Sequence, residues 1–83
     1  MELKDTIEMM NSEDYKERFK AEYYQTLIRY NRLSKMMESW DKVLTFGPFC
    51  DKKVAVDQLS FMAGYLDVLR DRAFVEDIEL EEI

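Results

Sequence analysis

The chain has 83 residues, 47% of them hydrophobic, and a formal net charge of −6. This length predicts one small domain over 1–83, and two helices cannot bury so much apolar surface between themselves, so we expect a homo-oligomer. The acidic balance argues against a duplex nucleic acid partner, which requires a broad basic surface.

The chain contains no histidine and a single cysteine, Cys50. Zinc, copper and non-haem iron sites of the usual His/Cys kinds are therefore nearly excluded, and we expect neither metal nor cofactor. A lone cysteine forms no internal disulfide, which fits a reducing cytoplasm. The N-terminus lacks the apolar core of a signal peptide, and no apolar run approaches the roughly 20 residues of a membrane span. We therefore expect a cytoplasmic protein with no membrane partner.

The N-terminal half predicts one long helix. The first eleven residues can form a short helix, in which Ile7, Met9 and Met10 need cover. Ser12 is the expected N-cap of a long helix at about 13–41, with acids in its first turn facing the positive end of the helix dipole. Apolar and aromatic residues recur along it at alternating intervals of four and three, which is typical of a helix buried along one stripe. This stripe comprises Phe19, Tyr23, Thr26, Tyr30, Leu33, Met37 and Trp40.

The strongest break is the run Phe-Gly-Pro-Phe-Cys at 46–50, so we assign 42–51 to a connection. A second helix is expected at about 52–75, with Asp51 as its cap. The predicted fold is therefore all-α, an antiparallel helical hairpin of two long helices that assembles into a homo-oligomer.

The second helix carries two neighbouring apolar stripes, which require two partners. One partner is the first helix, and the other is expected to come from a neighbouring subunit. Gly64 would cost the helix roughly 1 kcal/mol against alanine if it were exposed, so we expect another helix to pack closely there. The first stripe is Leu59, Met62, Leu66, Leu69 and Ala73, and the second is Phe61, Tyr65 and Val68.

The last eight residues, 76–83, contain five carboxylates and are expected to form an acidic tail. Such runs are usually solvated rather than binding elements. Ile78 and Leu80 alternate weakly, so this tail could lie extended on a neighbouring subunit.

Catalytic motifs are absent from the sequence, so we do not expect an enzyme. An anion site is better supported, because the stretch 23–37 has three basic residues, no acid and flanking tyrosines. Arg29, Arg32 and Lys35 follow one another at intervals of three, and converging cations favour phosphate. We take Arg29 and Lys35 as candidate ligand-binding residues. A solvated helix flank whose arginine stems cover apolar surface explains the same pattern equally well.

The second helix contains the run Q-L-S-x-M-x-x-Y-x-x-V-L-x-x-R at 58–72. The first helix begins with Y-x-x-R at 15–18, followed at matching intervals by Glu22 and Leu33. These motifs resemble those of a widespread family of small helical phage proteins that includes the anti-CBASS cyclic-oligonucleotide sponge proteins. The resemblance covers about residues 15–72.

The resemblance implies compact homo-oligomers, typically hexamers, acting in the cytoplasm of a host cell. The sponge proteins of this family bind cyclic dinucleotides, and in some cases cyclic trinucleotides, between subunits without cleaving them. Sequestration of the messenger keeps the host effector inactive. The matching positions imply ligand-binding roles for Tyr15, Arg18, Tyr65 and Arg72. For Tyr65, a role in packing alone is the alternative.

Two other functions stay open. The carboxylate-rich tail suits a protein-directed inhibitor of a host nuclease or defence complex. A helical assembly protein without a small ligand is favoured if the arginines of the first helix form ion pairs between subunits. Phe46 and Phe49 lie in a longer connection than the family has, and can line or block a pocket. Cys50, beside them, is expected to be a small buried apolar residue.

Overall fold

The computed structural model describes residues 1–40 and 51–83 of the chain. Every regular element within these two ranges is helical, which confirms the all-α class, and the short N-terminal helix is present. In chain order the elements are the 3-10 turn η1 (Leu3–Thr6), α1 (Ile7–Met10), α2 (Tyr15–Glu38) and α4 (Lys52–Val75).

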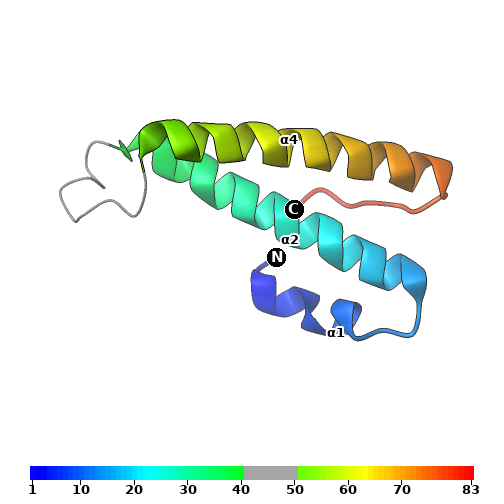
Figure 1. Cartoon of the computed structure of the whole chain (residues 1–83). Helices are drawn as coiled ribbons and strands as arrows, with labels where there is room; N and C mark the ends of the chain where they lie inside the picture. Colours follow the sequence, from blue (N-terminus) through cyan, green and yellow to red (C-terminus); the bar gives the residue numbers. More distant parts are fainter. Residues whose placement is uncertain (41–50) are drawn as a thin grey trace.

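The long helix α2 lies between its two neighbours, with α4 on one side and the N-terminal segment of η1 and α1 on the other (Figure 1). Helix α4 runs along α2 in the opposite direction (Figure 1). The two long helices have 24 residues each and are therefore about 36 Å long. The expected connection at 42–51 lies outside the described residues except for Asp51, as do the candidate residues Phe46, Phe49 and Cys50.

The start of α2 differs from the expectation, because Asp14 and not Ser12 is the N-cap. The Asp14 carboxylate accepts the Lys16 backbone N–H at 2.9 Å, and a carboxylate at this end also complements the helix dipole. The Ser12 hydroxyl instead accepts the Asp14 N–H at 3.0 Å, one step before the helix. The helix also ends earlier than expected, at Glu38, where the Ser39 N–H closes a tight last turn on the Met36 carbonyl at 3.1 Å.

The core between α2 and α4 is aromatic on one side and aliphatic on the other. Phe19 and Tyr23 of α2 are buried with Leu66, Leu69 and Ala73 of α4 in one cluster. These α4 residues are the inner part of the stripe that the sequence assigns to the first helix. On α2 the predicted stripe is less uniform, since its members Thr26, Leu33 and Met37 are only half-buried.

A second face of α2 is buried against the N-terminal segment, and the single-stripe interpretation missed it. Ala21, Gln25 and Ile28 share this face at intervals of four and three, and both apolar members are buried. The Gln25 side-chain amide donates to the Thr6 hydroxyl at 3.0 Å, and that hydroxyl donates to the Leu3 carbonyl at 2.7 Å. This bonding lets a fully buried threonine anchor the N-terminal segment without an unpaired polar group.

The chain reverses at the end of α4 through a Schellman turn. Asp77 takes a left-handed conformation with φ 58°, and the Ile78 N–H bonds to the Ala73 carbonyl at 2.8 Å. The Asp77 N–H faces the Phe74 carbonyl at 3.4 Å, which completes the pair of bonds typical of this motif. The turn sends the tail, residues 76–83, back toward its own helices (Figure 1).

The tail packs on the core of its own chain, whereas the sequence alone allowed it to lie on a neighbour. Ile78 is buried in the core cluster, and Leu80 packs against that cluster. The Glu81 backbone N–H donates to the Tyr24 hydroxyl at 2.9 Å. Two apolar side chains at alternate positions can cover a groove between helices while the carboxylates between them stay in water.

Ile78→Ala is expected to lower the free energy of unfolding by about 2–4 kcal/mol, because it removes a buried side chain from the core. Ile83→Ala, at an exposed position of the same tail, is the matched control and should change it by less than about 0.5 kcal/mol. Urea denaturation at one fixed protein concentration measures both. Equal, small effects would show that the tail does not pack as described.

Candidate functional site

Four side chains meet where α2 begins and α4 ends, and we call them the helix-end cluster: Tyr15, Phe19, Arg72 and Glu76. The Tyr15 hydroxyl donates to one Glu76 carboxylate oxygen at 2.8 Å and accepts from an Arg72 terminal nitrogen at 2.8 Å. Arg72 Nε donates to the other Glu76 oxygen at 3.2 Å. The guanidinium carbon also lies 4.9 Å from the centroid of the Phe19 ring, a cation–π distance.

This bonding shifts the titration of all three polar members of the cluster. The hydrogen bond to Glu76 raises the pKa of the Tyr15 hydroxyl, because that bond requires the proton. Hydrogen bonds from Tyr15, and then from Arg72, lower the pKa of Glu76 by stabilising its carboxylate. The hydrogen bond with Glu76 raises the pKa of Arg72 further. The cluster therefore holds one negative and one positive charge around neutral pH.

The sequence placed Tyr15 and Arg72 in one site through the family motifs, and the structure brings these two together. Arg18, the other half of the Y-x-x-R motif, is exposed and donates to the Ser12 carbonyl at 2.8 Å. Glu76 was missed as a site residue. Its spacing of four from Arg72 on one helix indicates an ion pair, but its bond to Tyr15 depends on how the two helices pack.

The two residues selected from the basic stretch lie apart. Arg29 lines a hollow of about 410 Å³ together with Lys4 and Ile7 of the N-terminal segment. Lys35 is exposed in the last turn of α2, about 9 Å further along and about 120° around the helix axis. Within the described residues, neither Arg29, Arg32 nor Lys35 makes a hydrogen bond or an ion pair. Their charge is therefore available to a ligand or to another subunit.

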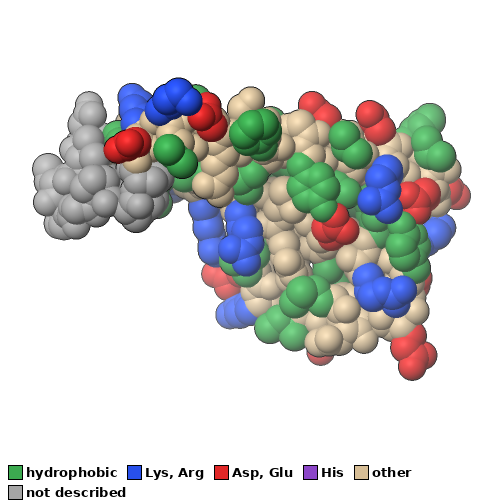
Figure 2. Space-filling model, viewed as in Figure 1, with side chains coloured by type: hydrophobic (Ala, Val, Ile, Leu, Met, Phe, Trp, Pro, Cys, Tyr) green, Lys and Arg blue, Asp and Glu red, His purple; other side chains and the backbone are tan. Residues whose placement is uncertain are grey.

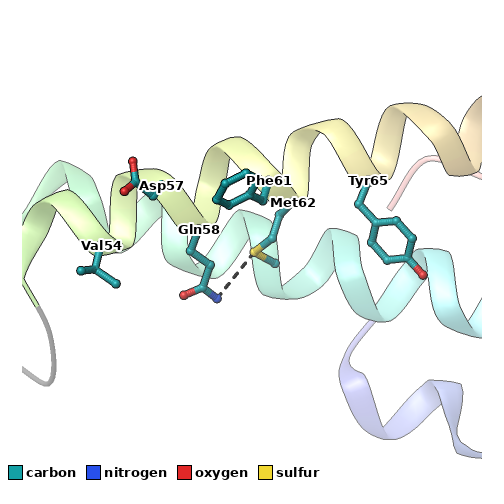
Figure 3. Close-up of a pocket in the computed structure, with 6 residues that line it drawn as sticks. All are labelled: Val54, Asp57, Gln58, Phe61, Met62 and Tyr65. Carbon is teal, nitrogen blue, oxygen red and sulfur yellow. Dashed lines mark hydrogen bonds between the residues drawn. The ribbon is translucent and has the colours of Figure 1, made fainter.

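Tyr65 belongs to a third place, an open groove of about 510 Å³ that runs along α4 (Figure 3). Every described residue that lines this α4 groove comes from α4 itself, so among the described residues one helix provides a single wall. On this wall the Gln58 amide donates to the Met62 sulfur, one helical turn further along, at 3.7 Å. The lining residues are Val54, Asp57, Gln58, Phe61, Met62 and Tyr65.

The exposed face of α4 is rich in apolar side chains. Phe61 is 79% exposed, Val68 54% and Tyr65 42%, so the described residues leave much of the second predicted stripe uncovered. Figure 2 shows hydrophobic side chains along α4 on the visible face, interspersed with acidic and basic groups. A Cβ added at Gly64 would meet no atom within 4 Å, so no described residue of this chain makes the close contact expected there.

Arg70, at the edge of the core, is hydrogen-bonded to a tyrosine of the other long helix. Its Nε donates to the Tyr23 hydroxyl at 3.1 Å, and a terminal nitrogen pairs with Asp67 at 3.1 Å. The hydrogen bond to Tyr23 raises the pKa of Arg70. The Asp67–Arg70 pair joins neighbouring turns of α4, whereas the bond to Tyr23 joins α4 to α2.

Across residues 1–40 and 51–83, no three side chains of His, Cys, Asp or Glu are arranged to hold a metal ion. In the same ranges, no helix has the length and hydropathy that crossing a bilayer requires.

Comparison with known proteins identifies a family. The family model named Sequestin matches residues 13–75, about three quarters of the chain. The chain belongs to the Sequestin family. No curated protein and no solved structure matches it.

The Sequestin match spans α2 and α4 and confirms the sponge-family resemblance that the motifs at 15–18 and 58–72 indicated. The match leaves out the N-terminal segment, and it ends one residue before Glu76. Membership in this family indicates a sequestering, binding function rather than an enzymatic one.

The helix-end cluster predicts a pH-dependent stability. Because the pKa of Glu76 is lowered by folding, its contribution is fully present above the ordinary carboxyl pKa of 4.5 and is lost as the pH falls through the lowered value. Because the pKa of Tyr15 is raised, its contribution is present below 10.0 and is lost as the pH rises through the raised value.

Glu76→Gln should therefore lower the free energy of unfolding at pH 7, and the difference from the natural chain should shrink below about pH 4. Glu79→Gln, at an exposed position of the tail with no bonding partner among the described residues, is the control and should show no such dependence. Urea denaturation between pH 3 and 8 measures both. A constant difference across this range would exclude the carboxylate as its source.

Proposed function

We propose that this Sequestin-family chain sequesters a cyclic oligonucleotide, a cyclic di- or trinucleotide, between subunits and does not cleave it. The family membership supports sequestration. The proposal that the ligand is a cyclic oligonucleotide is supported by the helix-end cluster. There a guanidinium and a phenol face outward beside an aromatic ring. The phage origin and the anti-CBASS role belong to the same proposal and rest on the family resemblance.

The chemistry of the cluster suits a phosphodiester. Arg72 presents donors in a planar fork that binds two anionic oxygens at once, and the Tyr15 hydroxyl adds a third donor. Tyr15 is about half exposed, so its ring can stack on a base. Arg18, Arg29 and Lys35 add positive charge at other places on the surface, and an assembly could bring them to the same ligand.

The proposed site requires more than one subunit. Within residues 1–40 and 51–83 the α4 groove has one wall, and the exposed stripe of Phe61, Tyr65 and Val68 gives a second copy an apolar face to bury. Gly64 interrupts this face with open space, which allows a neighbouring helix to approach closely. We therefore propose a homo-oligomer, and the family resemblance suggests a hexamer.

The protein-directed inhibitor is the second candidate, and the carboxylates exposed on the tail favour it. Deleting 76–83 cannot test it, because the deletion also removes Ile78 from the core. Replacing Glu79, Glu81 and Glu82 together by glutamine removes three charges and keeps the packing. Loss of inhibition in that variant, with ligand binding unchanged, would favour the protein-directed function. A ligand-free assembly is favoured if Arg29, Arg32 and Lys35 form ion pairs between subunits.

Isothermal titration with cyclic di-AMP, cyclic di-GMP and cyclic tri-AMP is expected to give saturable heat with at least one of them, and chromatography should return that ligand intact. Arg72→Ala should weaken binding roughly tenfold or more, because it removes charged donors to phosphate. Lys53→Ala removes an exposed cation of the same helix, paired with Asp57, and should leave the affinity within about twofold. Absence of heat from the whole panel would contradict the proposed ligand class.

Gly64→Ala tests the proposed interface. Within one chain the added methyl group meets no atom, and alanine favours the helix by up to about 1 kcal/mol, so each subunit should keep its fold. The assembly should dissociate more readily, because the methyl group enters the helix contact. Analytical ultracentrifugation over a dilution series measures this, with the exposed α2 change Asn31→Ala as the control. A Gly64→Ala chain that assembles as tightly as the natural one would place the interface elsewhere.

A further inference from the structure

Glu76 occupies the place that an anionic ligand would need at Arg72. Both of its carboxylate oxygens are used, one by the Tyr15 hydroxyl and the other by Arg72 Nε. A phosphate bound to the same two donors would present its oxygens to the same hydrogens. The two strongest candidate ligand residues of the chain therefore already hold an anion of the chain itself.

The chain fixes this carboxylate in position. Glu76 is the C-cap of α4, and its own N–H bonds to the Arg72 carbonyl at 2.8 Å. The Lys16 ammonium donates to the Asp77 carbonyl at 3.1 Å, which ties the turn after Glu76 to the first turn of α2. Ile78, two residues on, is buried in the core. The backbone at Glu76 is therefore held from both sides while its side chain can still rotate.

The ion pair is nevertheless open to solvent. The side chains of Arg72 and Glu76 are 46% and 32% exposed. Exposed pairs of this kind are weak and exchange readily with ions in solution. A ligand with two phosphodiesters can replace the carboxylate, since a carboxylate and a phosphate suit the guanidinium fork equally well.

We propose that Glu76 is an intramolecular competitor for the anionic ligand, so that a phosphate binds Tyr15 and Arg72 by displacing the Glu76 carboxylate. This inference rests on the proposed function. It makes Glu76 a residue that sets affinity, because the ligand must break the internal contact and then lies beside a displaced negative charge. Glu76 is the first residue after the segment that matches the Sequestin family, 13–75, so the competitor is supplied from outside that segment.

The test compares Glu76→Gln with Glu79→Gln by isothermal titration of the full chain with the three cyclic oligonucleotides. Glutamine keeps the size of the side chain and removes its charge. We expect Glu76→Gln to bind roughly threefold to tenfold more tightly than the natural chain, and Glu79→Gln to bind within about twofold of it. Unfolding measurements on each variant confirm that the fold is retained.

The outcomes separate the inference from the proposed function. If the natural chain binds a ligand and Glu76→Gln binds it equally or more weakly, Glu76 does not compete and the inference alone fails. If neither chain binds any ligand of the panel, both fail.

A second readout follows the carboxylate itself. Carbon NMR titration of Glu76 should show its pKa returning upward toward the ordinary carboxyl range when ligand is added, because the bonds from Tyr15 and Arg72 have gone to phosphate. A lowered pKa that persists in the complex would show that Glu76 stays bonded and would overturn the inference.

Discussion

Leu66 and Leu69 of α4 lie fully buried against Phe19 and Tyr23 of α2, and this contact fixes the relation between the two long helices. Full burial of each such side chain stabilises the fold by about 1.5–3 kcal/mol, a large share for so small a domain. Because α2 and α4 run in opposite directions, the contact sets the start of one beside the end of the other. The pairing of Tyr15 with Arg72 is a consequence of this geometry.

The N-terminal segment and the tail extend the core on two sides. Thr6 anchors the former through Gln25, and Ile78 brings the latter back after the Schellman turn. Their positions reconcile the acidity of the chain with an anion site. The tail carries most of the excess negative charge, yet it folds so that one carboxylate, Glu76, meets Arg72 while others stay in water. The local charge at the helix-end cluster is thus balanced, although the chain as a whole is acidic.

The family motif on α4 divides among three environments. Its Leu69 is core, its Arg72 belongs to the helix-end cluster, and its Gln58, Met62 and Tyr65 line the open groove. Such a division is expected when one helix has two partners, because the residues on each face must then suit a different surface. The buried face fixes the single chain. In the proposed assembly, another subunit would cover the exposed apolar face.

The amino-acid sequence by itself determined the long helices and the buried stripe of α4, because a period of 3.6 residues is a local property. The helix expected at about 52–75 spans Lys52–Val75, and the stripe assigned to the first helix contains Leu66, Leu69 and Ala73. Its motifs also determined the family, since they depend on spacing along single helices. The local pattern predicted Ser12 as the N-cap of the first long helix, whereas the N-cap in the structure is Asp14. The pattern could not distinguish them, because neighbouring polar residues compete for the same backbone donors.

Only the tertiary structure decided which distant groups meet. Tyr15 and Glu76 are 61 positions apart in the sequence, and no periodic pattern signals their hydrogen bond. The return of the tail depends on a turn at Asp77, whose left-handed backbone conformation is uncommon for residues other than glycine. Periodicity reports which face of a helix is apolar. It does not report what covers that face, and for Ile78 the answer was the chain's own core rather than a neighbour.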